Sequence, residues 1–460
     1  MTILHAGTAL LPGGWHRDVR VEIADGRIVR VTPGVPEGGL GGGQGGGQRV
    51  GCLLPAPVNL HSHMFQRAMA GLTERRSAGQ DSFWTWRTLM YRFLDQLTPQ
   101  DVQAIAAMVM VEMAEAGFAA VAEFHYLHHG PGGARYGDLA EMTARIAAAA
   151  LDTGLGLTHL PVLYQRGGCD GRALTAGQLR FGTDADQFAA LWAAAGNALR
   201  DLPADTVLGV APHSLRAVSP EGLALAAGLA PAAPLHIHVA EQLAEVTEVQ
   251  AATGQRPVEW LLDHHAIDAR WCLIHATQMQ PAETEAVARS GAVAGLCPIT
   301  EANLGDGIFD GQRYVAAGGR FGVGSDSNVR ISLTEELRLL EYSQRLGLKG
   351  RAILATADRS CGRVLFEGAV QGGAQAAGRA SGAIAPGLWA DLLALDLSHP
   401  DVAGAQGDTI LDTFIFARGD RMVQSVWSAG RPMVNGGRHH ARDAVTRAYG
   451  ATVARLRGAL

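Results

Sequence analysis

Several short apolar segments of the chain end in residues that bind metals or carry protons. The first reads Pro57-Val-Asn-Leu and then His61-Ser-His63, and residues two apart on a strand point to the same side. A single His-x-His motif is also compatible with a structural role, so the pattern on other segments matters. Three later segments of the same kind end in His236-Ile-His238-Val-Ala-Glu241, in Leu273-Ile-His275 and in Gly322-Val-Gly-Ser-Asp326.

Three histidines and one carboxylate suit a divalent metal with an open position for water, and this ligand set favours zinc. We predict one ion per chain, held by His61, His63, His238 and Asp326. Such an ion lowers the pKa of a water and yields hydroxide near neutral pH. Asp326 would also accept the proton of the water, Glu241 would shuttle protons, and His275 would orient the hydroxide.

The segments that must position these residues alternate with helical stretches. Thr98-Pro99-Gln100-Asp101 and Ser219-Pro220-Glu221 are typical helix starts. An α/β fold with eight strands and intervening helices favours a parallel (β/α)8 TIM barrel. A doubly wound open sheet is the alternative, but its first strand would precede a glycine-rich loop, and here histidines follow. The expected strands are 52–60, 119–125, 155–163, 206–211, 234–239, 271–275, 292–297 and 320–325.

Each end of the chain has a pattern of consecutive strands with no helices between those strands. Near the N-terminus, alternating apolar residues flank an Asp25-Gly26 hairpin turn. Near the C-terminus, strands are expected at 382–384, 390–396, 423–427 and 430–434. We predict a small β-sandwich domain from residues 1–53 and 380–435, a barrel over 54–379 and a terminal helix over 436–460. The glycine-rich stretch 38–48 is expected to be a surface loop.

A barrel of this kind can hold two metals bridged by a carboxylated lysine on its fourth strand. Lys349 is the only lysine of the chain and follows the eighth expected strand, so a lysine bridge is excluded. Glu123 could bridge two ions, but a structural role is favoured. His236 lies one layer deeper than His238, and we expect a packed core histidine there. The prediction is therefore a single metal.

Composition excludes several classes of protein. The net charge is −6 and no basic run occurs, which argues against a nucleic-acid partner. No apolar stretch approaches the length that spans a membrane, and the first residues do not read as a signal peptide. The five cysteines are scattered and odd in number, which favours a cytoplasmic enzyme over a disulfide scaffold.

The motifs resemble the amidohydrolase superfamily. The His-x-His, His-x-x-Glu, later His and final Asp match its mononuclear aminohydrolase branch in order and approximate spacing. Within that branch, four stretches and the late segment 382–391 are similar to the formimidoylglutamate deiminases, so that the similarity covers nearly the whole chain. The four stretches are 59–72, 123–129, 211–216 and 324–327. A glycine-rich insertion at 41–47 departs from the family pattern.

The resemblance implies hydrolysis of N-formimidoyl-L-glutamate to N-formyl-L-glutamate and ammonia in histidine degradation. It also implies a homodimer. A dicarboxylate amidine substrate needs fixed cations, and arginine binds a carboxylate with two hydrogen bonds. By resemblance and position after the expected strands, the substrate contacts are Gln66, Arg87, Tyr126, His213 and Arg216. Two other readings stay open: a guanine-type deaminase, and a noncatalytic barrel that binds a metal or ligand.

Overall fold

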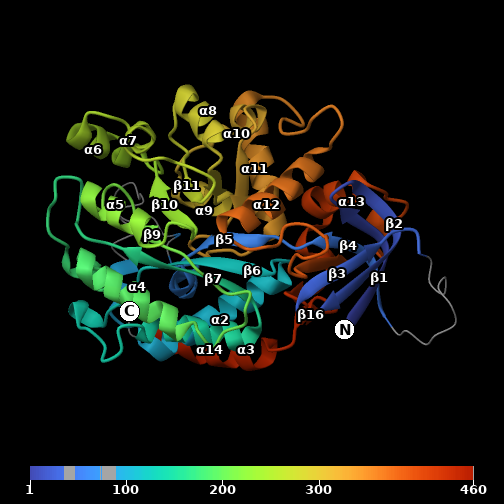
Figure 1. The fold of residues 1–460 in the computed structure, drawn as a ribbon, viewed down its shortest axis with the longest axis horizontal. Helices are drawn as coiled ribbons and strands as arrows, with labels where there is room; N and C mark the ends of the chain where they lie inside the picture. Colours follow the sequence, from blue (N-terminus) through green and yellow to red (C-terminus); the bar gives the residue numbers. More distant parts are fainter. Residues whose placement is uncertain (36–46, 73, 75–89, 459–460) are drawn as a thin grey trace.

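Parallel strands and helices alternate around a closed barrel, and a small sheet lies beside it (Figure 1). The computed structural model describes residues 1–35, 47–72, 74 and 90–458. Arg87 and most of the glycine-rich stretch lie outside the described residues. Within the described residues, no helix is both long enough and apolar enough to cross a bilayer.

The barrel strands pair in parallel in sequence order. They are β5 (Val58–Ser62), β6 (Ala120–His125), β7 (Gly156–Leu163), β8 (Val207–Leu208), β9 (Ala211–Pro212), β10 (Leu235–Val239), β11 (Trp271–His275), β12 (Val293–Leu296) and β13 (Arg320–Val323). The two short strands β8 and β9 both pair with β7 and share the fourth position. Bridges between Val210 and Leu235 and between Ser62 and Asp326 close the ring. The predicted fold class is confirmed.

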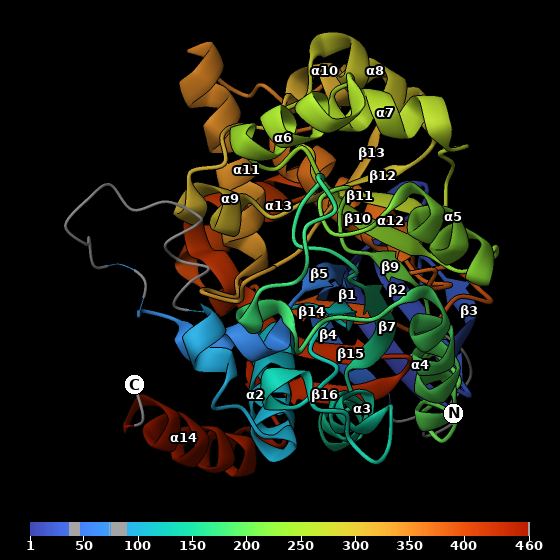
Figure 2. The same cartoon turned by 90° about the vertical axis from the view of Figure 1, so that its left-hand side faces the viewer.

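Helices surround the strands, with α6, α7, α8 and α10 on one side and α2, α3 and α14 on the other (Figure 2). The described helices are α2 (Pro99–Glu115), α3 (Glu141–Thr153), α4 (Ala185–Ala198), α5 (Pro220–Leu229), α6 (Leu243–Thr253), α7 (Pro257–His264), α8 (Pro281–Ser290), α9 (Pro298–Leu304), α10 (Gly311–Ala316), α11 (Leu333–Leu348), α12 (Cys361–Ala376), α13 (Asp408–Thr413) and α14 (Arg442–Gly458). Helix α2 starts as the sequence predicts. The Thr98 hydroxyl accepts from the Asp101 amide, and the Asp101 carboxylate accepts from the Thr98 amide at 2.9 Å.

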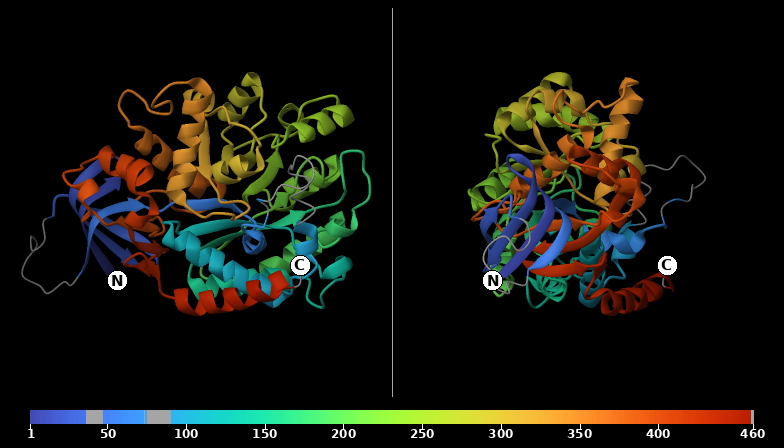
Figure 3. Two further views of the ribbon diagram at one scale, coloured as in Figure 1. Left: turned by 180° about the vertical axis from the view of Figure 1, so that it is seen from behind. Right: turned by 90° about the vertical axis from the view of Figure 1, so that its right-hand side faces the viewer.

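The small sheet is built from both ends of the chain, and its N-terminal and C-terminal strands lie side by side (Figure 3). Its order is β17-β16-β15-β14-β4-β1-β2-β3. The strands are β1 (Thr2–Leu11), β2 (Gly14–Ala24), β3 (Arg27–Thr32), β4 (Gln48–Pro55), β14 (Leu392–Leu395), β15 (Val423–Ser428), β16 (Arg431–Asn435) and β17 (Arg438–His439). The turn between β2 and β3 uses positive φ at Asp25 and Gly26, as a hairpin turn requires.

Three local predictions were wrong. The segment 52–60 is the end of β4 followed by β5, because Pro55 and Pro57 interrupt the ladder. Residues 382–384 form no strand: Gly382 has φ +92°, although Ile384 is buried against the small sheet. The segment 436–460 begins with β17, and its helix starts only at Arg442.

A buried ion network connects the barrel to the small sheet. Asp205, in the loop before β8, contacts Arg379 Nη2 and Arg431 Nη1, both at 2.7 Å. Arg379 follows α12 and also contacts Asp391, beside β14, at 2.6 Å. Burial opposes ionisation of Asp205, but the two arginines outweigh it and lower the pKa of this carboxyl to about 2.

We predict that Asp205→Asn lowers the free energy of unfolding by about 3–5 kcal/mol, because it leaves buried arginine charge uncompensated. Denaturant titration at neutral pH measures this loss. An exposed aspartate has a pKa of about 3.9, so the stabilisation is present above that pH and is lost as the pH falls toward 2. Asp201→Asn, at an exposed position of the same loop, is the control. Equal stability of the two variants at neutral pH would contradict the prediction.

Candidate active site

The carboxyl ends of the barrel strands surround one pocket that holds most of the predicted site residues. Residues at or after the ends of eight strand positions reach it. The predicted residues that line it are His63, Gln66, Tyr126, His213, Arg216, His238, Glu241, His275 and Asp326. His61 is fully buried directly behind this wall. The pocket is therefore at the end of the barrel where enzymes of this fold place their chemistry.

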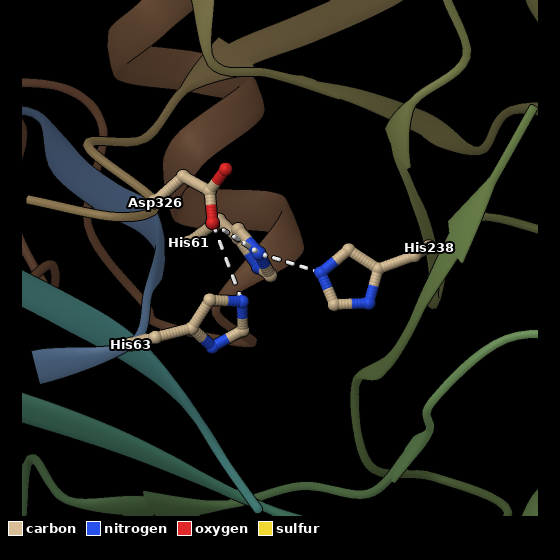
Figure 4. A group of neighbouring side chains, drawn as sticks. All are labelled: His61, His63, His238 and Asp326. Atoms are coloured by element: carbon tan, nitrogen blue, oxygen red, sulfur yellow. Dashed lines mark hydrogen bonds and ion pairs between the residues drawn. The ribbon is translucent and has the colours of Figure 1, made fainter. Parts of the chain in front are cut away.

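The four predicted metal ligands point toward one another (Figure 4). His61 and His63 come from the end of β5, His238 comes from β10, and Asp326 follows β13. One donor atom from each lies within 4.8 Å of the others. Asp326 Oδ1 is 3.4 Å from His61 Nε2 and 3.3 Å from His63 Nε2, and His238 Nε2 is 3.0 Å from His61 Nε2.

This donor set fits a divalent cation. His63 Nδ1 lies 2.9 Å from the Phe124 carbonyl oxygen and His238 Nδ1 lies 3.0 Å from that of His213. A carbonyl only accepts, so both Nδ1 atoms carry the proton and both Nε2 atoms direct a lone pair at the centre of the group. Burial also lowers the pKa of His61, His63 and His238, which keeps the imidazoles neutral, the form that binds a metal.

Beside the ligand group, His275 lies between two carboxylates. Its Nε2 is 3.7 Å from Glu241 Oε1 and 3.8 Å from Asp326 Oδ2. Burial raises the pKa of the Glu241 carboxyl, which helps it to hold a proton. His275 and Asp326 have φ of +68° and +45°, in the left-handed region. Backbone strain of this kind is common where a fold holds functional side chains.

Two further carboxylates position these groups, and the sequence argument missed both. Glu245, at the start of α6, accepts from the amides of Ala240 and Glu241, each at 3.1 Å. Glu301 Oε1 lies 3.3 Å from His275 Nδ1 and accepts from the Cys297 amide at 2.8 Å. An acidic residue four positions after Glu241 was a weak signal for the first. No sequence motif near His275 indicates Glu301, because Glu301 belongs to the next strand-helix unit of the chain.

Four of the five predicted substrate contacts lie around the same pocket. Gln66 Nε2 donates to the Tyr126 hydroxyl at 2.7 Å. The His213 ring lies 4.9 Å from the His238 ring, centre to centre. Arg216 Nη2 lies 3.9 Å from Glu241 Oε2. The fifth, Arg87, falls outside the described residues.

The residues considered as alternatives lie elsewhere. His236 Nε2 donates to the Ala376 carbonyl oxygen at 2.7 Å, and His236 is not among the residues that line the pocket. Glu123 accepts from the Met64 amide at 2.9 Å, a positioning contact behind the ligands. Lys349 is exposed at the end of α11. Among the described residues, the ligand group thus contains three histidines and one aspartate.

Two family models and a curated relative match the chain. The family model of the amidohydrolase family matches residues 52–433, and the model for the N-terminal domain of the formimidoylglutamate deiminase HutF matches residues 1–39. Formimidoylglutamate deiminase of Pseudomonas aeruginosa is 48% identical over 454 residues, which cover 98% of each chain.

Two solved structures share the fold. An amidohydrolase from Brucella melitensis has 49% identity and a TM-score of 0.95, over 99% of this chain and 100% of that one. An adenosine deaminase from Xanthomonas campestris with bound zinc has 22% identity and a TM-score of 0.81, over 99% and 98% of the two chains.

We predict that the purified protein contains about one equivalent of a divalent metal and that His61→Ala loses it, since one of the four donors is removed. Metal analysis by mass spectrometry measures both. His236→Asn, two residues from His238, removes a buried imidazole outside the ligand group and should keep the ion. Two tightly held equivalents that are both required for activity, or a retained ion in His61→Ala, would show the ligand assignment to be wrong.

Proposed function

The chain belongs to the amidohydrolase family, and we propose that it hydrolyses N-formimidoyl-L-glutamate to N-formyl-L-glutamate and ammonia, a step of histidine degradation. The end-to-end similarity to the Pseudomonas aeruginosa deiminase carries this proposal. The pocket supports it independently, because it combines a metal-ligand group, two facing proton-transfer residues and an arginine.

The ion that we propose is zinc, held by His61, His63, His238 and Asp326. Neutral imidazoles with one carboxylate are a ligand set that zinc accepts. When bound, zinc lowers the pKa of a water and thereby supplies a nucleophile near neutral pH.

The protein's own residues then divide the proton transfers. The oxygen of water adds to the formimidoyl carbon, and Asp326 and Glu241 are placed to accept the protons that leave this oxygen. His275 Nε2 faces both carboxylates and is placed to hydrogen-bond the oxygen as it becomes bound to carbon. The terminal nitrogen takes up both protons: Glu241 gives it the first as the oxygen adds, and the proton held by Asp326 follows as the bond between this nitrogen and carbon breaks, so that the carbonyl forms and ammonia leaves.

The two carboxylates of the substrate set the other requirement of the pocket. We propose that Arg216 binds one of them and Arg87 the other, with polar contacts from Gln66, Tyr126 and His213. The Arg216 guanidinium is buried and already lies beside Glu241 and Glu245, so its charge is fixed at the pocket wall. A fixed, desolvated arginine suits an anionic substrate better than a neutral purine.

The compartment and assembly are also proposals. All five cysteines are free thiols, and four of them are buried. Free thiols support the cytoplasmic location that we propose. The homodimer rests on the family resemblance, and the molar mass in solution tests it.

We predict that Glu241→Gln keeps the metal but loses about 100- to 10,000-fold in turnover, because glutamine keeps the shape of the side chain but cannot carry the proton. Steady-state ammonia release and metal analysis on the same sample measure the two effects. His275→Asn should lose turnover in the same way. Glu248→Gln, on α6 and outside the pocket lining, is the matched control. Near wild-type turnover in Glu241→Gln would refute the shuttle.

We predict that Arg216→Ala and Arg87→Ala each lower kcat/KM about 30-fold or more, since each leaves one substrate carboxylate unpaired at a cost of about 2–5 kcal/mol. Metal content should not change. Analogues that lack one carboxylate show which end each arginine binds: each variant should lose discrimination against a different analogue. Normal processing of the full substrate by both variants would rule out the dicarboxylate assignment and leave metal-dependent hydrolysis intact.

A further inference from the structure

The third strand position of the barrel supplies a pocket residue to which no role has been given. Tyr164 is the first residue after β7 and lines the pocket with Tyr126, His213 and Arg216. Its ring stands at 68° to the His213 ring with a centre-to-centre distance of 4.6 Å. The phenol and the Arg216 guanidinium are also close enough to interact electrostatically. Tyr164 therefore belongs to the part of the pocket that carries fixed positive charge.

A buried glutamine fixes the direction of the Tyr164 hydrogen bond. Gln178 Nε2 lies 2.8 Å from the Tyr164 hydroxyl. Gln178 Oε1 accepts from the Thr175 amide at 2.8 Å and from the Thr175 hydroxyl at 2.9 Å. A backbone N–H can only donate, so the glutamine oxygen must face Thr175 and the NH2 group must face Tyr164. The phenol oxygen is thereby the acceptor, and its own O–H remains a donor.

A second glutamine contacts a second phenol beside the neighbouring strand. Gln66 Nε2 donates to the Tyr126 hydroxyl at 2.7 Å, and Gln66 and Gln178 are 3% and 2% exposed. The Tyr126 hydroxyl donates to the Met90 sulfur at 3.8 Å, whereas the Tyr164 hydroxyl accepts from Gln178 and has a proton to donate. Donors beside a buried arginine select an anion, because they satisfy the lone pairs of a carboxylate and repel a group that only donates.

From this geometry we propose that Tyr164 is a specificity-determining residue, whose hydroxyl donates to the same substrate carboxylate that Arg216 binds. Gln178 is its positioning residue, since it holds the phenol in the donor direction. This inference rests on the proposed function, because it requires an anionic substrate in the pocket.

The experiment compares Tyr164→Phe with wild type on N-formimidoyl-L-glutamate and on two analogues, each lacking one carboxylate. Loss of a hydrogen bond to a charged group should lower kcat/KM about 10- to 150-fold, mainly through KM. One analogue lacks the carboxylate that Tyr164 contacts, and with this analogue Tyr164→Phe and wild type should have the same kcat/KM. Arg216→Ala should no longer discriminate between the full substrate and that same analogue. Tyr314→Phe removes another buried, hydrogen-bonded phenol hydroxyl away from the pocket and should leave KM unchanged.

Gln178→Glu tests the direction of the hydrogen bond. The new carboxylate can still accept from Thr175, but it would also accept from Tyr164 and turn the phenol away from the substrate. We expect a rise in KM similar to that of Tyr164→Phe, and no further rise when both changes are combined. If Gln178→Glu raises KM by the same factor in wild type and in Tyr164→Phe, the positioning role is overturned.

The outcomes distinguish a failure of the role of Tyr164 from a failure of the proposed function. Suppose that wild type hydrolyses N-formimidoyl-L-glutamate. If Tyr164→Phe then has a normal KM, or if its loss in kcat/KM is equal with both analogues, the role of Tyr164 is refuted and the function stands. If wild type releases no ammonia from this substrate, the proposed function itself fails.

Discussion

The site depends on one constraint: three buried imidazoles and a carboxylate must meet at one point although they come from three distant parts of the chain. Two imidazole nitrogens approach to 3.0 Å, and the main-chain carbonyls behind His63 and His238 leave lone pairs on the inner nitrogens. A divalent cation at this point would accept these lone pairs. Ring closure between Ser62 and Asp326 brings the last donor beside the first two. The closed barrel is therefore a condition for binding the metal.

The same strand ends separate two kinds of chemistry within one pocket. Around His275, the carboxylates of Glu241, Glu301 and Asp326 form a negative, proton-handling side. Beside Glu241, Arg216 and the phenols of Tyr126 and Tyr164 form a part of the pocket wall that favours anions. Glu245 connects the two, since it holds the backbone of Glu241 and lies 4.0 Å from Arg216. A substrate with an amidine at one end and carboxylates at the other matches this division.

Much of this could be predicted from the sequence, because strand periodicity and chain order place His61, His63, His238, His275 and Asp326 at strand ends. Motifs cannot reveal contacts between residues far apart in the chain, and Glu301, the Gln178–Tyr164 pair and the Asp205 network are of that kind. The strand boundary at Pro55–Pro57 was missed for another reason: both flanking segments are apolar, so hydrophobicity does not show that they belong to different sheets. The ligand and proton-transfer roles remain predictions that the geometry supports.

The most direct test of the central claim is ammonia release by the purified, metal-loaded protein from N-formimidoyl-L-glutamate, measured beside guanine, cytosine and 5-methylthioadenosine at equal concentrations. We expect kcat/KM for N-formimidoyl-L-glutamate to exceed that for each base or nucleoside, and removal of the metal by a chelator to abolish the release until zinc is restored. Preference for a cyclic base would contradict the assignment of the substrate. Full activity after the metal has been removed would contradict the account of the site as a whole.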